Sequence, residues 1–203
     1  MSKVEFFFDC SSPWTYLAFC RIQGIIKETN TNVLWRPILV GGVFNEINKD
    51  IYEARENPNP VKFKYLRKDL QDWADSYSVI INWPEVFPLN AVNVMRAVLV
   101  AEKFDKLVPY SFLCFEEYWS KGVDISDLEI LCEMAYSIGI DRTDFKEMIL
   151  RQETKDLLRK NTSELIERGG FGSPTVFINN NDMYFGNDRL ELVKQKILRH
   201  NNN

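Results

Sequence analysis

The chain has a single histidine among its 203 residues, and this scarcity removes several kinds of active site. His200 stands close to a polar, asparagine-rich end, so almost no material is present for a histidine-based triad or a metal cluster. The cysteines show no CxxC spacing; they are Cys10, Cys20, Cys114 and Cys132. We therefore expect no metal site, and we expect Cys20, Cys114 and Cys132 to be free, mostly buried thiols.

Basic runs and long apolar runs are absent as well. The formal net charge is −4 and no run of five or more basic residues occurs, which argues against a nucleic-acid partner held through its phosphates. No window reaches the roughly 18–20 apolar residues of a membrane-spanning helix. Residues 1–9 enter a strand-like pattern without the apolar stretch and cleavage site of a signal peptide. We therefore predict a cytoplasmic protein without a membrane partner.

The first forty residues predict a strand, a helix and a second strand. Val4–Asp9 is short, rich in aromatic residues and followed by a Ser-Ser-Pro break, as expected for a buried strand. From Pro13 to about Lys27 the spacing is helical, with Ser12 in the N-cap position. Asn32–Leu39 is a second strand-like segment. This order favours parallel pairing of the two strands through a right-handed crossover.

The middle of the chain predicts helices and one long polar connection. The connection follows Gly41-Gly42 and ends in Asn57-Pro58-Asn59-Pro60, and loops of this length are usually functional or flexible. Residues 83–88 are expected to form a loop. Ser126 to Glu129 form a capping-box signature at the start of a helix. The predicted helices are residues 61–77, 89–105, 107–120, 126–138, 142–150 and 154–168.

The end of the chain returns to strands. Thr175–Ile178 and Met183–Phe185 are strand-like on either side of an asparagine-rich turn, and a final helix begins at Asn187 or Asp188. Strand–turn–strand–helix thus completes what strand–helix–strand began. We therefore predict one α/β domain that is interrupted by a helical insertion.

Ser12 and Thr15 stand at the junction of the first strand and the first helix. The free N–H groups and partial positive charge of a helix N-terminus stabilise an anion or a thiolate. In proteins of the thioredoxin type a CxxC motif occupies this junction, and here hydroxyls stand where the cysteines would be. A hydroxyl cannot exchange disulfides, but it can donate a hydrogen bond to a thiolate that another molecule brings. By itself Ser12 is also typical of a plain N-cap, and nearby Cys10 is either a displaced nucleophile or an inert strand end.

Two further candidate sites lie near the end of the chain. The Ser173–Pro174 bond can be cis, which would turn the Ser173 backbone outward to pair with a peptide-like ligand; a trans proline that starts an edge strand is the alternative. Gly186 permits close backbone approach, the helix amides after it suit a carboxylate, and the Asp188 carboxylate suits an ammonium group. These preferences match the α-amino acid end of a γ-glutamyl group. A plain helix cap explains Asn187 and Asp188 equally well.

In their order along the chain, these pieces resemble the family of 2-hydroxychromene-2-carboxylate isomerases. That family is related to the kappa-class glutathione transferases within the wider DsbA-like group. Each piece is weak alone, but the ordered set spans nearly the whole chain. The matching pieces are Phe8-Asp9 through Ser12-Pro13, Tyr16-Leu17-Ala18, Arg36-Pro37, Gly41-Gly42-Val43-Phe44, Lys62, Tyr65-Leu66, Asp69-Leu70, Phe87-Pro88-Leu89-Asn90, Phe171-Gly172-Ser173-Pro174-Thr175 and Phe185-Gly186-Asn187-Asp188-Arg189-Leu190.

The resemblance implies a thioredoxin-like α/β fold with an all-helical domain inserted between its strand-helix-strand and strand-strand-helix halves. Residues 1–60 and 169–203 are expected to form the thioredoxin-like domain, and residues 61–168 the helical insertion. A homodimer is also implied by this likeness alone.

The resemblance further implies a glutathione-dependent isomerase with Ser12 as its catalytic serine. Ser12 would contact the glutathione sulfur, and Ser173 and Pro174 would hold the cysteinyl part. Lys62 falls where the family places a lysine toward the cofactor. The γ-glutamyl part would be bound by Phe185, Gly186, Asn187 and Asp188.

The implied reaction is a cis/trans isomerisation. The glutathione thiolate adds to an electron-poor double bond, the resulting single bond rotates, and the thiolate is expelled. Arg36 and Asn90 are candidates for binding the carboxylate and the ring of a small aromatic or electrophilic substrate. Trp14, beside the serine, suits either stacking on that substrate or packing in the core.

Two other functions stay open. A kappa-like transferase would use the same thiolate but would consume glutathione by conjugating it to electrophiles, whereas an isomerase returns it unchanged. The second open function is that of a thioredoxin-fold module that binds glutathione but catalyses no reaction. A DsbA-like oxidoreductase would need the missing CxxC. The chain departs from the family pattern over Asn45–Asn59, which shows no clear match, and at Cys10, where related chains usually carry an apolar residue.

Overall fold

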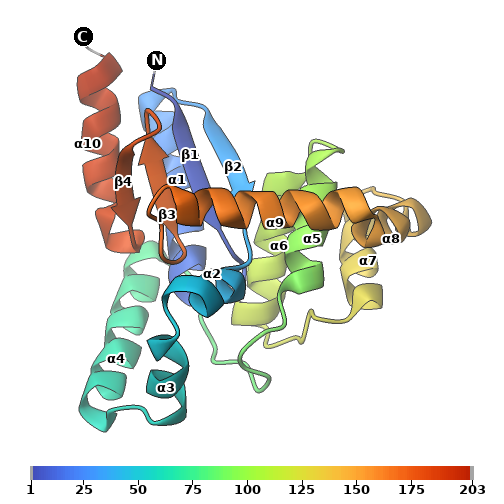
Figure 1. Ribbon diagram of the computed structural model, residues 1–203, viewed down its shortest axis with the longest axis horizontal. Coiled ribbons are helices and arrows are strands. Elements are labelled where there is room, and N and C mark those ends of the chain that lie inside the picture. Colours follow the sequence, from blue (N-terminus) through green and yellow to red (C-terminus); the bar gives the residue numbers. More distant parts are fainter. Residues whose placement is uncertain (1, 202–203) are drawn as a thin grey trace.

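A four-stranded sheet lies at the centre of the α/β part in the computed structural model, which describes residues 2–201 (Figure 1). The strand order is β2-β1-β3-β4. β1 pairs with β2 in parallel, as the sequence predicts, and β3 pairs antiparallel with both β1 and β4. The strands are β1 Val4–Phe8, β2 Val33–Pro37, β3 Thr175–Ile178 and β4 Asp182–Phe185.

Helices follow β1, fill the middle of the chain and close it. None of the helices in residues 2–201 combines the length and the apolar character needed to cross a membrane. Their bounds are α1 Pro13–Thr29, α2 Val40–Ile47, α3 Asp50–Glu56, α4 Pro60–Tyr77, α5 Val92–Glu102, α6 Leu107–Phe115, the π-helical turn η1 Glu116–Ser120, α7 Leu128–Ser137, α8 Arg142–Leu150, α9 Gln152–Glu167, the 3₁₀ turn η2 Asn187–Arg189 and α10 Leu190–Asn201.

The predicted polar connection between the second strand and residue 60 is wrong, because that segment forms α2 and α3. Gly41-Gly42 indicated a break, since glycine is a poor helix former, but both residues lie inside α2. Burial of Val43 against Phe7 on the sheet outweighs that low propensity. A smaller correction concerns α7, whose N-cap is Asp127 and not Ser126: the Asp127 carboxylate accepts a hydrogen bond from the Glu129 amide.

β1 is buried on both faces, and this determines how the helices are layered. Phe6 and Phe8 pack toward α1 and α10, where the Phe6 ring lies 5.5 Å from Trp35 and 6.2 Å from Phe19. Phe7 points to the opposite face, which α2 and α9 cover, and its ring lies 5.6 Å from Phe177. A strand with two apolar faces needs helices on both sides, as found in α/β layers.

The helical part and the sheet share one continuous hydrophobic core. A single buried cluster runs from β1 and β3 through α5, α6, α7 and α8. Helix α9 begins among those helices and crosses onto the Phe7 face of the sheet, as its horizontal orange ribbon shows (Figure 1). The predicted division into 1–60 with 169–203 and an insertion 61–168 stays a prediction.

A buried ion pair joins the start of the sheet to the end of α9. The Glu5 side chain is only 2% exposed, and its Oε2 lies 2.8 Å from Nη2 of Arg168 and 3.3 Å from Nζ of Lys3. Burial raises the pKa of Glu5, but the hydrogen bonds and charges of Arg168 and Lys3 outweigh this and hold the pKa below its usual value. The Arg168 guanidinium also lies 3.9 Å from the centre of the Phe177 ring.

Replacement of Glu5 by glutamine should lower the free energy of unfolding by about 1–3 kcal/mol at neutral pH, because Arg168 loses its buried anionic partner. The folded-state pKa of Glu5 lies below its ordinary value, so the contribution is fully present above the ordinary pKa and is lost as the pH falls through the folded value. Denaturant unfolding from pH 3 to pH 7 measures this difference. The control Glu147→Gln breaks an exposed pair with Arg151 and should change stability by less than about 0.5 kcal/mol. A Glu5→Gln effect that stays constant with pH would contradict the assignment.

Candidate functional site

The three sites predicted from the sequence meet at one edge of the sheet. β1 ends there, β3 begins there and β4 ends there, because Phe7 pairs with Thr175 and Thr175 pairs with Phe185. The Ser12 hydroxyl lies 3.4 Å from the Ser173 carbonyl oxygen, and the Gly186 amide donates to the Pro174 carbonyl at 3.1 Å. Segments that are about 160 residues apart in sequence therefore form one site.

Ser12 is the N-cap of α1, as predicted. Its backbone is extended, Pro13 occupies the first helical turn, and its Oγ accepts a hydrogen bond from the Thr15 amide at 3.3 Å. The hydroxyl is half-buried, and its proton points to the Ser173 carbonyl over a long 3.4 Å contact. A ligand anion at the helix N-terminus can replace so weak an acceptor.

Ser173 connects β1 and α1 to the loop before β3. Its Oγ accepts a hydrogen bond from the Asp9 amide at 3.0 Å and lies 2.7 Å from the Thr15 hydroxyl oxygen. The Ser173–Pro174 peptide bond is cis, the first of the two alternatives that the sequence allows. The sequence predicts a role for the Ser173 backbone only. The signal for its hydroxyl is Thr15, a polar residue on the buried side of α1.

Asp9 is a buried carboxylate that the sequence analysis did not single out. Its Oδ1 accepts from the Ser11 amide at 2.8 Å, and its Oδ2 accepts from the Val40 amide at 2.7 Å. Burial raises the pKa of the Asp9 carboxyl against the opposing effect of these hydrogen bonds. Val40 is the first residue of α2, and Leu39 before it offers no side-chain cap. Asp9 thus attaches the start of α2 to the end of β1.

Cys10 is an inert part of the strand end in this structure. Its side chain is fully buried, its amide donates to Met95 Sδ at 3.3 Å, and its carbonyl accepts from Trp119 Nε1 at 2.9 Å. Burial, together with the neighbouring Cys114 thiol, raises the pKa of the Cys10 thiol well above its ordinary value. Between the two interpretations of Cys10, the geometry favours the inert one.

The Gly186 turn needs a glycine. Its φ angle is +102°, and a Cβ at this position would lie 2.7 Å from Asp188 Oδ1. The Asp188 carboxylate is exposed and pairs with Arg189 at 2.6 Å. Asn187 is buried, and its Nδ2 has no hydrogen-bond partner within residues 2–201. A buried amide donor without a partner is costly, and a ligand can supply the missing acceptor.

Phe185, at the end of β4, packs against the loop before β3. Its side chain is 39% exposed, and its ring lies 4.4 Å from the ring of Phe171. Gly172 leaves room for it, since a Cβ there would lie 2.8 Å from Phe185 Cε2. The predicted site residues therefore lie at this one edge, on its loops and turns and at the end of β4: Ser12, Ser173, Pro174, Phe185, Gly186, Asn187 and Asp188.

Neither the Arg36 nor the Lys62 side chain contacts the residues of this edge within residues 2–201, although Arg36 pairs with Phe7 in the sheet. Arg36 forms an ion pair with Glu164 and lies over Phe7, on the face of the sheet that α9 covers. Lys62 is exposed in the first turn of α4, whereas α4 packs on α1 about two turns later, through Leu70.

Trp14 and Asn90 have local contacts of their own. Trp14 is half-buried and packs with Leu17 and Leu70 between α1 and α4, in agreement with the core-packing alternative. Asn90 is exposed in the loop before α5, where its Oδ1 accepts from the Val92 amide at 3.4 Å.

Comparison with known proteins identifies the family. The family model of the DSBA-like thioredoxin domain matches residues 3–198. The chain belongs to this family. This DSBA-like chain carries Ser12 and Thr15 where a disulfide oxidoreductase needs its cysteines.

Its relatives include enzymes of two activities. The 2-hydroxychromene-2-carboxylate isomerase of Sphingobium xenophagum is 26% identical over 96% of this chain and 97% of its own length. The Pseudomonas putida enzyme of the same name is 28% identical over 97% and 94%. Human glutathione S-transferase kappa 1 is 28% identical over 94% and 88%. These full-length likenesses confirm the predicted resemblance and support an isomerase enzyme, with kappa-class transferases as a second group.

Solved structures agree with the predicted fold class. A 2-hydroxychromene-2-carboxylate isomerase structure superposes with a TM-score of 0.80 at 27% identity, over 97% of this chain and 94% of that one. A probable DsbA oxidoreductase from Streptomyces coelicolor has a TM-score of 0.78 at 14% identity, over 98% and 89%, and supports the fold alone. The thioredoxin-type α/β fold with inserted helices is thus confirmed.

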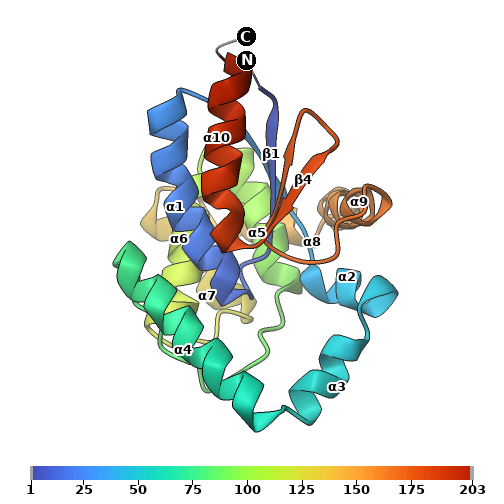
Figure 2. The ribbon, with the colours of Figure 1, turned by 90° about the vertical axis from the view of Figure 1, so that its left-hand side faces the viewer.

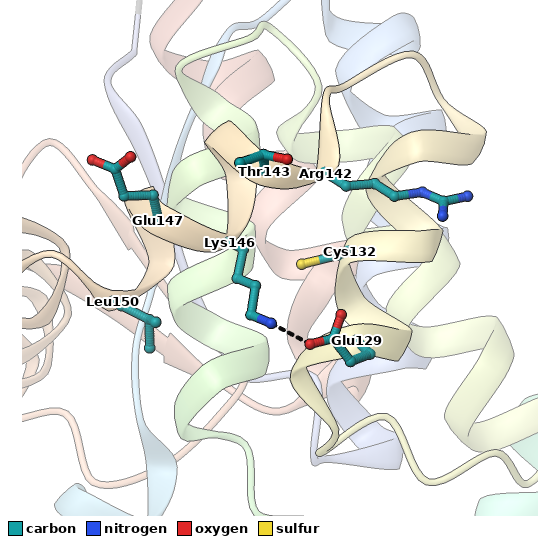
Figure 3. Close-up of a pocket in the computed structure, with 7 residues that line it drawn as sticks. All are labelled: Glu129, Cys132, Arg142, Thr143, Lys146, Glu147 and Leu150. Carbon is teal, nitrogen blue, oxygen red and sulfur yellow. Dashed lines mark hydrogen bonds and ion pairs between the residues drawn. The ribbon is translucent and has the colours of Figure 1, made fainter.

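The DSBA-like chain also has a hollow of about 440 Å³ between α7 and α8, away from this edge (Figure 3). The two cations that line it form ion pairs with carboxylates: Lys146 pairs with Glu129, and Arg142 pairs with Glu133 at 2.5 Å. None of the predicted site residues lines it. Its lining residues are Glu129, Cys132, Arg142, Thr143, Lys146, Glu147 and Leu150. We therefore place the candidate site at Ser12 and not in this hollow.

Replacement of Ser173 by alanine should lower the free energy of unfolding by about 1–3 kcal/mol, because the buried Asp9 amide and the Thr15 hydroxyl lose their shared partner. Denaturant unfolding measures the change. The control Ser163→Ala alters an exposed position of α9 and should shift stability by less than about 0.5 kcal/mol. Equal effects of the two substitutions would show that the Ser173 hydroxyl does not hold the site together.

Proposed function

We propose that this chain is a glutathione-dependent isomerase of the 2-hydroxychromene-2-carboxylate type, in which Ser12 holds the glutathione sulfur. The observation that carries the proposal is the Ser12 hydroxyl, which caps α1 and faces the Ser173–Pro174 loop. Full-length likeness to isomerases of that name supports the reaction, and likeness to kappa-class transferases supports glutathione use.

The polar groups of the site fit the parts of glutathione. Within residues 2–201 the Ser173 amide has no internal hydrogen-bond partner, so it is available to the cysteinyl backbone next to the cis Pro174. The unpartnered Nδ2 of buried Asn187 suits the carboxylate of the γ-glutamyl group. The exposed Asp188 carboxylate suits the ammonium group of the same end.

When bound, glutathione supplies a thiolate that adds reversibly to an electron-poor double bond and so allows rotation about it. Ser12 moves its hydroxyl hydrogen bond from the Ser173 carbonyl to the sulfur, and the N-terminal end of α1 adds its partial positive charge. Both effects favour the ionised thiol. Thr15 has its hydroxyl committed to Ser173 and keeps α1 in place. The buried Cys10 thiol, with its raised pKa, does not compete as a nucleophile.

The remaining predictions rest on the family likeness. Lys62 toward glutathione and Asn90 or Trp14 toward a small aromatic substrate stay predictions. Arg36 already forms an ion pair with Glu164, and this weakens the prediction that Arg36 binds the substrate carboxylate. A cytoplasmic homodimer is the expected form of the protein. A kappa-like transferase is the second candidate, because those relatives are as similar as the isomerases.

Product analysis with 2-hydroxychromene-2-carboxylate and glutathione tests the proposal. We expect the ring-opened trans isomer of the substrate to form while all glutathione is recovered. Ser12→Ala should lower kcat/KM by about 10²–10³-fold, because a hydrogen-bond donor to the developing thiolate is lost. Ser12→Thr keeps the hydroxyl and the N-cap and should retain most of the activity. Conjugates that consume glutathione would favour the transferase, and full activity of Ser12→Ala would contradict the role of Ser12.

A further inference from the structure

Two aromatic rings on the loop 83–88, tilted by 52° to each other, form an apolar surface that we call the Trp83–Phe87 shelf. The ring centres of Trp83 and Phe87 are 4.8 Å apart, and they lie 5.9 Å and 6.2 Å from the ring of Trp119. Trp119 in turn donates to the Cys10 carbonyl, two residues before Ser12. Direct contacts therefore connect the shelf to the start of α1.

Two arginines reach the shelf from different helices. Arg55 of α3 lies 5.6 Å from the centre of the Phe87 ring and 5.4 Å from that of Phe44. Arg67 of α4 lies 4.9 Å from the centre of the Trp83 ring. Figure 2 shows this loop, in green, running between α4 on one side and α3 on the other. Arg55 lies in α3, in the segment that the sequence predicts as a polar connection.

Neither arginine is neutralised by the protein. Within residues 2–201, the guanidiniums of Arg55 and Arg67 have no ion pair and no hydrogen bond. The other arginines that lie over aromatic rings all bind carboxylates: Arg36 binds Glu164, Arg142 binds Glu133 and Arg168 binds Glu5. Stacking on a ring fixes the plane of a guanidinium, and its free N–H groups then present a fork that matches a carboxylate.

We propose that Arg55 and Arg67 bind the carboxylate of a flat aromatic acid whose ring lies on the Trp83–Phe87 shelf. This inference rests on the proposed function, because it gives the substrate of the Ser12 site its own binding surface. It also assigns the substrate carboxylate to residues other than Arg36. Glutathione carries carboxylates too, but it has no ring for the shelf, so the proposed ligand is the aromatic acid.

Calorimetric binding of trans-2-hydroxycinnamate and of its uncharged amide to the full chain, without glutathione, tests this inference. Both arginines are exposed, and their guanidiniums offer charge-assisted hydrogen bonds to a carboxylate. The wild type should therefore bind the acid at least about tenfold more tightly than the amide, which lacks the charge. Arg55→Gln and Arg67→Gln should each remove most of that preference. Arg67→Lys keeps a charge but not the fork and should fall between Arg67→Gln and the wild type.

The matched control is Arg142→Gln. Arg142 lies 4.3 Å from the centre of the Tyr136 ring but is in the helical part, away from the shelf. This variant should bind acid and amide as the wild type does, and all variants should keep their affinity for glutathione. Unchanged binding of the acid by Arg55→Gln and Arg67→Gln, or no acid preference in the wild type, would overturn the inference.

Turnover separates this inference from the proposed function. Isomerisation by the wild type with an unchanged KM in both arginine variants would overturn the inference alone. Arginine-dependent binding of the acid without any isomerisation would overturn the proposed function alone.

Discussion

The hydroxyl of Ser173 accepts a hydrogen bond from the Asp9 amide, 164 residues away in the chain, and the candidate site depends on this contact. The same oxygen lies 2.7 Å from the Thr15 hydroxyl, so one buried atom joins the end of β1, the first turn of α1 and the loop before β3. Asp9 and Thr15 are fully buried, and a buried amide and a buried hydroxyl must find partners within the protein. The ends of the chain are therefore held together at the place where Ser12 stands.

The other polar groups at the end of β1 are satisfied in the same way. The Asp9 carboxylate accepts from the Ser11 and Val40 amides, and Trp119 donates to the Cys10 carbonyl. These contacts come from α2 and from the π-helical turn after α6, so both the sheet layers and the helical part fix this strand end. Ser12 thus sits on a rigid support, as catalytic geometry requires. Its own hydroxyl contact, by contrast, is long and free to change partner.

Local patterns in the sequence were enough to predict most of the fold. The aromatic run of β1, Pro13 after a serine and the turn before β4 each indicate their structure within a few residues. The segment α2–α3 was missed because its two glycines and polar residues oppose the helix locally, while the contact of Val43 with the sheet favours it. That contact involves residues distant in sequence, and no local pattern reveals it.

Local patterns also predict part of the candidate site, whereas the residues that act through distant contacts are not predicted. Ser12, Ser173 and the Gly186–Asp188 turn stand at element boundaries, which the sequence marks with proline and glycine. Arg36 is predicted from its chemistry and its place in the family's motif, and only the fold shows that it pairs with Glu164, 128 residues later. Asp9 and Trp119 act through backbone groups on other elements, so their residue types alone gave no signal.

The central claim is that Ser12 and the N-terminus of α1 hold an ionised glutathione thiol. Calorimetric titration of glutathione at pH 7, in buffers that differ in ionisation enthalpy, tests it most directly. A free thiol has a pKa of about 8.5, so its ionisation on binding must release a proton to the buffer. We predict binding with a net release of protons. Binding without proton release, or no binding at millimolar glutathione, would contradict the account.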